Sequence, residues 1–300
     1  MKTLIIGAKG MLGHELAKAF LDWKPYLWDM DEIDITNQAQ VNEKISDLGP
    51  ELIINAAAYT NVDACETNEE LATKVNGEAV GYLAEAAVKI GAILVHYSTD
   101  YVFDGSKKEG YGEDDEPNPV NAYGRSKLVG ERVILNEAKR SEESQGLSTG
   151  SFAGAQDDGF KYYIIRTAWL YGKDGKNFVE TMLSLAEKGQ PIKVIDDQIG
   201  SPTYAVDLAK ATHELVESNQ PSGIYHRTGS GQTSWYGFAK EIFTVFNKQV
   251  DLLPCTTAEY PLPAKRPAFS VLNSTKLAPM RTWQEALRAY AQERAVDSPK

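Results

Sequence analysis

Tyr123 and Lys127 are a tyrosine and a lysine four residues apart, in a stretch whose pattern predicts a helix over 123–139. At this spacing both side chains project from one face of a helix. A free tyrosine has a pKa of about 10 and exchanges protons poorly near neutral pH, but a lysine ammonium and a cofactor's positive charge would both lower that pKa. The pair could therefore serve as a general acid toward a carbonyl that is being reduced. The alternative is an ordinary surface pair, because a tyrosine and a lysine at this spacing are more often a surface pair than a catalytic one.

A glycine-rich segment, GAKGMLG at 7–13, follows an apolar strand expected at 3–6 and opens a helical pattern. Its glycines, Gly7, Gly10 and Gly13, allow a tight turn and let backbone amides approach a pyrophosphate at the positive end of the helix. Glycine-rich turns also occur for packing reasons alone. The position directly after the first strand favours the dinucleotide-binding interpretation.

Asp29 ends the expected second strand, 26–28, where a carboxylate can accept hydrogen bonds from an adenosine ribose. The alternative is a solvent-exposed turn acid, and Asp31 or Asp34 could be mistaken for it. The Asp29 carboxylate should disfavour a ribose 2′-phosphate, whereas Lys9 in the glycine segment could soften that preference. The sequence therefore leaves NADH and NADPH both open as cofactors.

The elements that must position these residues alternate along the chain. Short, nearly all-apolar stretches separated by helical patterns are typical of parallel strands covered on both faces. They lie at 3–6, 26–28, 52–54, 92–96 and 162–165. We expect an α/β fold, a Rossmann-type doubly wound parallel sheet, with a smaller C-terminal α/β substrate lobe. Ser98, Thr99 and Asp100 follow the fourth stretch, at the sheet edge where such folds bind ligands, although they could simply cap the strand end.

The chain divides most simply into a dinucleotide-binding domain and a second lobe. We expect the first to cover 1–168, with part of 203–227, and the second to cover 169–202 and 228–300. Residues 104–121 read as a long loop. Residues 140–159 are polar, small and nearly free of large apolar side chains, so they predict a mobile surface insertion.

Composition narrows the class of protein. With 31 Lys and Arg against 42 Asp and Glu, the formal net charge is −11, which argues against nucleic-acid or anionic-membrane partners. Two distant cysteines, Cys65 and Cys255, predict neither a disulfide framework nor a zinc site, and we expect no bound metal. No apolar run approaches a membrane span. These features predict a reduced, soluble, cytoplasmic protein.

Longer segments make the sequence recognisable. It resembles the extended short-chain dehydrogenase/reductases and, within them, the dTDP-4-dehydrorhamnose reductases. The likeness covers nearly the whole chain, and its most specific segments are STDYVFDG (98–105), DDQIGSPT (196–203) and the RP-containing YPLPAKRPAFSVLN (260–273).

The resemblance implies roles for individual residues. Thr99, Tyr123 and Lys127 match the family's catalytic triad: Tyr123 would protonate the substrate's C4 oxygen, Lys127 would bind the nicotinamide ribose and lower the Tyr123 pKa, and Thr99 would hydrogen-bond the reacting carbonyl. Asp100, Trp169 and Arg266 match contacts to the sugar nucleotide, Arg266 at the diphosphate. Positions matching contacts to the cofactor, besides the glycines and Asp29, are Met11, Leu12, Ala57, Ala58, Tyr59, Thr60 and Tyr97.

The preferred hypothesis is an NAD(P)H-dependent reductase that converts dTDP-4-dehydro-L-rhamnose to dTDP-L-rhamnose. An epimerase or dehydratase acting on another nucleotide sugar, and a non-catalytic regulatory subunit of the same fold, are the alternatives. We expect a monomer or a homodimer. Some relatives dimerise through metal-bound carboxylates; Glu15 fits one such position, but Val206 stands where a second carboxylate is needed.

Overall fold

The computed structural model describes residues 1–146 and 159–297. Within them, a central sheet of six parallel strands has the order β10-β5-β4-β3-β1-β2. The strands are β1 (Thr3–Ile6), β2 (Tyr26–Trp28), β3 (Leu52–Asn55), β4 (Ile93–Thr99), β5 (Tyr162–Thr167) and β10 (Gly223–His226). From β1 the chain adds β2 on one side and then adds β3, β4, β5 and β10 in turn on the other side. This is the strand order of a doubly wound Rossmann-type sheet. The predicted fold class is confirmed.

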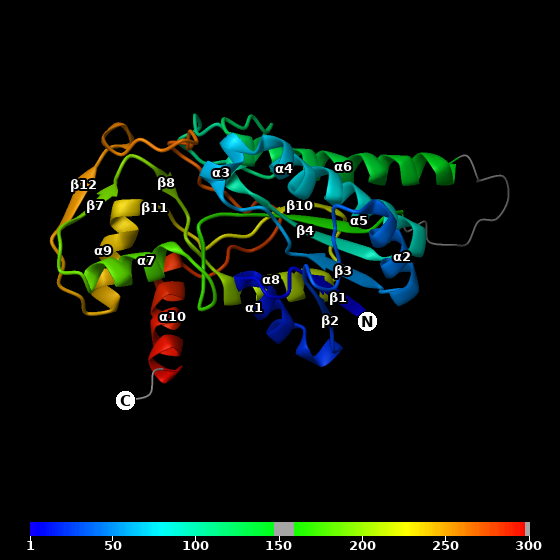
Figure 1. Ribbon diagram of the computed structural model, residues 1–300, viewed down its shortest axis with the longest axis horizontal. Coiled ribbons are helices and arrows are strands. Elements are labelled where there is room, and N and C mark those ends of the chain that lie inside the picture. Colours follow the sequence, from blue (N-terminus) through cyan, green and yellow to red (C-terminus); the bar gives the residue numbers. More distant parts are fainter. Residues whose placement is uncertain (147–158, 298–300) are drawn as a thin grey trace.

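Helices cover both faces of this sheet (Figure 1). They are α1 (Met11–Ala19), α2 (Gln38–Leu48), α5 (Ala79–Ile90), α6 (Ala122–Gly146) and α8 (Ala205–Glu217). Successive strand residues point to opposite faces, so in β1 Leu4 and Ile6 join the core under α2, α5 and α6, whereas Ile5 joins the core under α1 and α8. Residues 203–227 thus contribute a covering helix and the edge strand β10 to this layer.

Small residues let α6, the helix that carries Tyr123 and Lys127, approach the segment before α5 closely. That segment comprises α3 (Val62–Thr67), α4 (Glu69–Thr73) and a π-helical turn, η2 (Lys74–Glu78). A Cβ on Gly77 would lie 2.6 Å from Val129 Cγ1, and one on Gly130 would lie 2.3 Å from the Asn76 carbonyl oxygen. Larger side chains at these glycines would push α6 away from the sheet.

The polar insertion begins later than the sequence indicated. Helix α6 continues to Gly146, so the expectation of an insertion starting at residue 140 is wrong for 140–146. This stretch is rich in charged residues that favour helix, and Arg140 forms an ion pair with Glu137 one turn earlier. The rest of the predicted insertion, 147–158, lies outside the described residues. The chain re-enters the core at Phe160, which is buried.

The second part of the chain, on the left of Figure 1, is built on two-stranded sheets. They pair β6 (Leu170–Tyr171) with β9 (Thr203–Tyr204), β7 (Ile192–Ile195) with β12 (Leu252–Cys255), and β8 (Ile199–Gly200) with β11 (Thr233–Ser234). The helices here are α7 (Phe178–Ala186), α9 (Trp235–Val245) and α10 (Trp283–Asp297). Aromatic side chains such as Tyr171, Phe238 and Tyr290 dominate their shared core. Short strands are tolerated because this aromatic packing, rather than a long hydrogen-bond ladder, buries the apolar surface.

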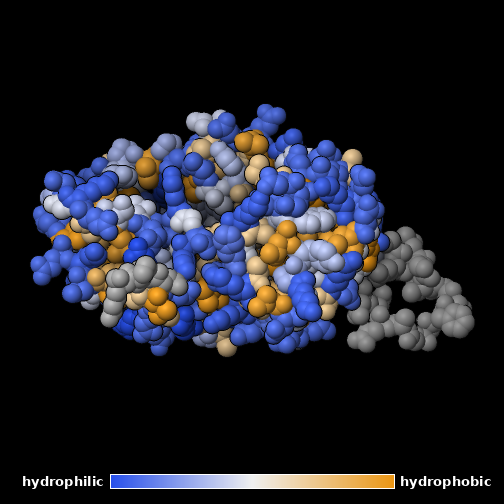
Figure 2. Space-filling view, turned by 60° about the horizontal axis from the view of Figure 1, so that its bottom comes forward, coloured by the Kyte–Doolittle hydropathy of each residue, from blue (hydrophilic) through white to orange (hydrophobic). Residues whose placement is uncertain are grey.

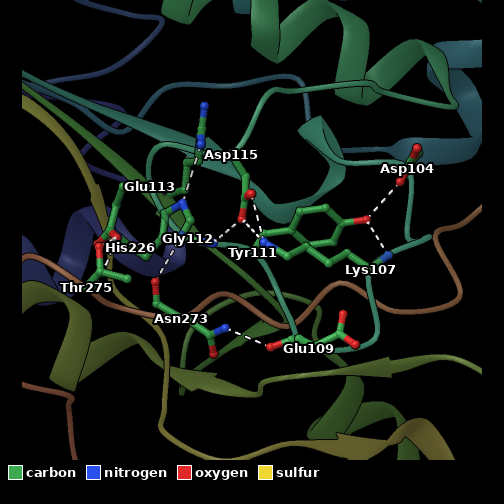
Figure 3. Close-up of polar contacts among 11 residues, drawn as sticks. Asp104, Lys107, Glu109, Tyr111, Gly112, Glu113, Asp115, His226, Asn273 and Thr275 are labelled. Carbon is green, nitrogen blue, oxygen red and sulfur yellow. Dashed lines mark hydrogen bonds and ion pairs between the residues drawn. The ribbon is translucent and has the colours of Figure 1, made fainter.

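The loop that follows β4 is held by side-chain hydrogen bonds (Figure 3). Tyr111 Oη donates to Asp104 Oδ1 at 2.8 Å, and Lys107 Nζ lies 2.6 Å from Asp115 Oδ2. Glu113 accepts from the Thr275 backbone amide at 2.9 Å and from the His226 amide at 3.1 Å, so it joins the loop to β10 and to a C-terminal segment. The long loop expected at 104–121 is therefore held in one conformation where it connects to α6.

Polar side chains prevail on the surface. On the face that Figure 2 shows, hydrophilic residues predominate and apolar ones lie in separate patches. Among the helices of the described residues, none is long and apolar enough to span a membrane.

Candidate active site

A cavity of about 540 Å³ opens at the carboxyl ends of the central strands, between the sheet and the second part of the chain. Most of the predicted site residues line it. They are Gly10, Met11, Leu12, Gly13, Ala58, Thr60, Tyr97, Thr99, Asp100, Tyr123, Lys127 and Trp169. This is where an open α/β sheet is expected to bind its ligands.

Tyr123, Thr99 and Lys127 come together because β4 ends beside the first turns of α6. Asn121 caps that helix, its Oδ1 accepting from the Gly124 amide at 2.7 Å, so Tyr123 is fixed in the first turn. Thr99 Oγ1 accepts from the Tyr101 amide at 3.2 Å. One turn into α6, the Lys127 ammonium is buried and donates to the Tyr97 carbonyl oxygen at 2.7 Å.

Asp100 brings a second acid into the same corner. Thr99 Oγ1 donates to its Oδ1 at 3.0 Å, and the Asp100 side chain is almost fully buried. Burial raises the pKa of Asp100 to about 6. Hydrogen bonds from the Ser270 and Thr99 hydroxyls oppose that rise.

The charge states of Tyr123 and Lys127 are set mainly by burial. Burial and the Asp100 carboxyl raise the pKa of Tyr123, while the Thr99 hydroxyl opposes that rise. The expected lowering of the Tyr123 pKa by Lys127 is therefore not found: Lys127 donates to a backbone carbonyl, and burial lowers its own pKa to about 8. A raised phenol pKa keeps Tyr123 protonated at neutral pH, which is the state that a proton donor requires.

A buried ion pair lies one helical turn beyond Lys127. Glu131, four residues after Lys127 on α6, accepts two hydrogen bonds from Arg166 on β5, at 2.9 Å from Nε and 2.7 Å from Nη2. Both side chains are almost fully buried, and Ser98 Oγ also donates to Glu131. The negative charge of Glu131 works against the lowering of the Lys127 pKa. The pair thus ties the helix that carries Tyr123 to two central strands.

The glycine segment makes a tight turn that leads into an uncapped helix N-terminus. Gly7 has φ +81°, and a Cβ there would lie 2.6 Å from the Ala57 nitrogen. Gly10 is the N-cap of α1, and no side chain caps that helix end, so its first amides are available to an anion. Asp29, at the end of β2, accepts from the amides of Lys9 and Met30, both at 2.9 Å. The residues present therefore fit a dinucleotide.

Four predicted cofactor residues are not part of the cavity lining: Gly7, Asp29, Ala57 and Tyr59. The amides of Ala57 and Tyr59 donate to the side chains of Asn55 at 3.1 Å and Asn76 at 2.8 Å. These bonds fix the chain after β3, where Ala58 and Thr60 do line the cavity.

Trp169 forms one wall of the cavity together with a residue that the sequence did not single out. Its ring stacks on Trp235, the first residue of α9, with centroids 3.5 Å apart and planes 8° from parallel. Trp169 has φ +46°, and Gly200 makes room for it, since a Cβ there would lie 2.5 Å from the indole. The paired indoles give the cavity a flat aromatic wall against which a base or a sugar can pack.

Arg266 is held outside the cavity lining. Its two terminal nitrogens donate to the two carboxylate oxygens of Asp63, each at 2.9 Å, and this guanidinium lowers the pKa of Asp63. The expected role of Arg266 at a diphosphate stays a prediction.

Comparison with known proteins decides the family. Residues 1–142 and 153–296 match the RmlD substrate binding domain family. The chain belongs to this RmlD family. It is 41% identical over 313 residues to a dTDP-4-dehydrorhamnose reductase of Aggregatibacter actinomycetemcomitans, covering 97% of this chain and 99% of that one. It is 40% identical over 300 residues to the spore coat polysaccharide biosynthesis protein SpsK of Bacillus subtilis, covering 98% of each.

A solved RmlD-family relative has the same fold. The dTDP-4-dehydrorhamnose reductase of Bacillus anthracis, crystallised in complex with NADP, superposes with a TM-score of 0.88 at 37% identity, covering 98% of this chain and 100% of that one. The resemblance inferred from the sequence segments is confirmed.

Sequence reasoning missed several residues of this RmlD-family site. Trp235 and Lys176 line the cavity but come from segments far along the chain, and sequence reasoning assigned neither of them a role. Glu131 did carry a signal, because it continues the four-residue spacing of Tyr123 and Lys127 on the same helix face.

We expect Gly13→Ala to destabilise this RmlD-family protein. A Cβ at Gly13 would lie 2.1 Å from the Gly7 carbonyl oxygen, a backbone atom that has little room to move, so the free energy of unfolding should fall by about 1–3 kcal/mol. Urea denaturation measures it. Gly81→Ala is the matched control, since its Cβ would lie 3.6 Å from Val133 and alanine favours helix. Equal stability of the two variants would contradict the prediction.

Proposed function

We propose that the protein reduces dTDP-4-dehydro-L-rhamnose to dTDP-L-rhamnose with NADPH or NADH. Near-full-length identity of about 40% to named reductases supports the reaction. The observation that carries the proposal is the convergence of Tyr123, Thr99 and Lys127 on a cavity that also contains the glycine segment. A proton donor and a dinucleotide site in one cavity are the two things that reduction of a ketone needs.

Each residue has a distinct task in this proposal. The bound nicotinamide cofactor supplies the hydride. Tyr123, kept protonated by burial, gives its proton to the C4 oxygen, and Thr99 donates a hydrogen bond that stabilises charge on that oxygen. Lys127 holds the nicotinamide ribose. Asp100 and the stacked indole of Trp169, which both line the cavity, contact the sugar nucleotide.

We also propose the division of labour along the chain. Residues 1–168, with part of 203–227, hold the dinucleotide, and residues 169–202 and 228–300 hold the sugar nucleotide. Support comes from the cavity itself, whose walls are Gly10 to Gly13 on one side and Trp169 with Trp235 on the other.

The test is direct. When purified enzyme is mixed with the dTDP-ketosugar and NADPH, the absorbance of NADPH should fall as it is oxidised, and dTDP-L-rhamnose should form. No oxidation of NADPH, together with tightly held NAD that co-purifies, would favour an epimerase or dehydratase instead. Dependence on a persistent heteromeric partner would favour a regulatory subunit.

Asp29→Asn should move the cofactor preference toward NADPH. Loss of the carboxylate removes a charged hydrogen bond to the ribose of NADH and the repulsion of a 2′-phosphate, so the ratio of kcat/KM for NADPH over NADH should rise about tenfold. Steady-state kinetics with each cofactor measures this ratio. Asp47→Asn, an exposed acid on α2, makes the same change of charge and should leave the ratio unaltered. An unchanged ratio in Asp29→Asn would remove Asp29 from the cofactor site.

A further inference from the structure

The loop between β6 and α7, residues 172–177, crosses from the second part of the chain to the N-terminus of α1. Gly172 packs on the side chain of Met11, since a Cβ there would lie 3.1 Å from Met11 Cγ, and one on Gly175 would lie 3.8 Å from Met11 Cβ. On the outer side, His14 Nδ1 lies 3.1 Å from Asp174 Oδ2. The loop thus rests on the first turn of the helix whose amides face the dinucleotide site.

Asn177 sets the conformation of this loop. Its Nδ2 donates to the carbonyl oxygens of Gly172 at 2.8 Å and Gly175 at 3.3 Å, while its Oδ1 caps α7 by accepting from the Glu180 amide at 3.1 Å. Gly175 has φ +92°, which a side chain would disfavour. Because these hydrogen bonds hold the loop at both ends, they fix the backbone position of the residue between Gly175 and Asn177.

That residue is Lys176, and it lines the cavity together with Gly10 to Gly13. The other lysine of the cavity wall, Lys127, is buried and donates to a backbone carbonyl, and Arg266 is held by Asp63. Lys176 is exposed, and the contacts found among residues 1–146 and 159–297 include no ion pair of its ammonium. Lys176 thus shares the cavity with the uncapped N-terminus of α1, and an anion bound there would be attracted by both the ammonium and the helix amides, although the net charge of the protein is −11.

We infer that Lys176 binds the diphosphate of the dinucleotide, on the side opposite the amides at the start of α1. This inference rests on the proposed reductase function, because that function supplies the dinucleotide. A nucleotide sugar carries a diphosphate too, but the packing of the loop on Met11 favours the one at α1. Lys176 is then a cofactor-binding residue contributed by the part of the chain that holds the substrate.

Isothermal titration of the full-length protein with NADPH and NADH tests the assignment. Lys176→Ala should weaken both about tenfold, the loss expected for one charge-assisted contact, and Lys176→Arg should restore most of the affinity. The alanine variant should also show a flatter dependence of Kd on salt, which a loss of loop structure alone would not produce. Lys188→Ala, an exposed lysine just after α7, is the matched control and should bind as the unaltered protein does.

A parallel titration with dTDP separates the two diphosphates. Weaker binding of dTDP with unchanged binding of NADPH would overturn the assignment, as would no change in either. These titrations need no turnover. Loss of NADPH affinity in Lys176→Ala, in a protein that reduces no dTDP-ketosugar, would therefore refute the proposed reaction and support the lysine's role.

Discussion

Tyr123→Phe should lower kcat by about a thousandfold while leaving the Kd of NADPH nearly unchanged. The substitution removes a single hydroxyl, and general acid catalysis contributes a factor of about 10²–10⁴. The ring itself stays packed, because it lies edge-on to Tyr101 at 6.0 Å between centroids and that contact needs no hydroxyl. Stopped-flow measurement of a single turnover, beside NADPH titration, separates the chemical step from binding.

Tyr101→Phe is the informative comparison. Tyr101 lines the same cavity, and burial raises its phenol pKa as it does that of Tyr123. Among the described residues, no hydrogen bond joins its hydroxyl to Thr99, Tyr123 or Lys127, so we expect kcat to change less than about tenfold. A large loss of kcat in Tyr101→Phe, with near-normal turnover in Tyr123→Phe, would make Tyr101 the proton donor and overturn the mechanism.

The parts of the site that the sequence predicted are those positioned by local rules. The glycine segment directly follows a strand, and Tyr123 and Lys127 are neighbours on one helix face, so short-range periodicity was enough. Their meeting with Thr99 also followed, because the carboxyl ends of parallel strands share one edge of the sheet.

What the sequence did not predict depends on contacts between distant segments. Trp169 lies just before β6 and its stacking partner Trp235 begins α9, while Arg266 contacts Asp63 across 203 positions. No periodicity relates such residues, since only tertiary packing brings them together. The sequence likewise showed the lysine near Tyr123, but neither the burial that raises the Tyr123 pKa nor the carbonyl that accepts the hydrogen bond of the lysine.

The extension of α6 illustrates a different kind of error. Residues 140–146 were assigned to an insertion because they cannot bury much apolar surface. A helix that already has many turns packed on the sheet needs no burial to continue, because adding a residue is far easier than nucleating a helix. Polarity alone therefore predicts exposure, and not the absence of helix.

Glu131→Gln should cost more stability than any other charge-removing change considered for this chain. It leaves the Arg166 guanidinium almost fully buried without its counter-charge, for which about 3–5 kcal/mol of unfolding free energy is expected. Chemical denaturation of the variant measures the loss. Glu69→Gln is the matched control, since Glu69 also makes a two-point contact with an arginine of α6, Arg125, but at an exposed site worth at most about 1 kcal/mol.

The same substitution should also change the pH dependence of the reaction, which a purely structural role would not. In the proposed mechanism Lys127 acts in its charged form, so with its pKa near 8 activity should fall as pH rises through that value. Because Glu131 works against the lowering of that pKa, its loss should move the alkaline limb of the kcat/KM profile to lower pH. If Glu131→Gln fails to fold, Glu131→Gln with Arg166→Met removes both buried charges and leaves the same shift to be measured. If the pH at which kcat/KM falls on the alkaline side is unchanged in the folded variant, Glu131 serves only to hold α6 against the sheet.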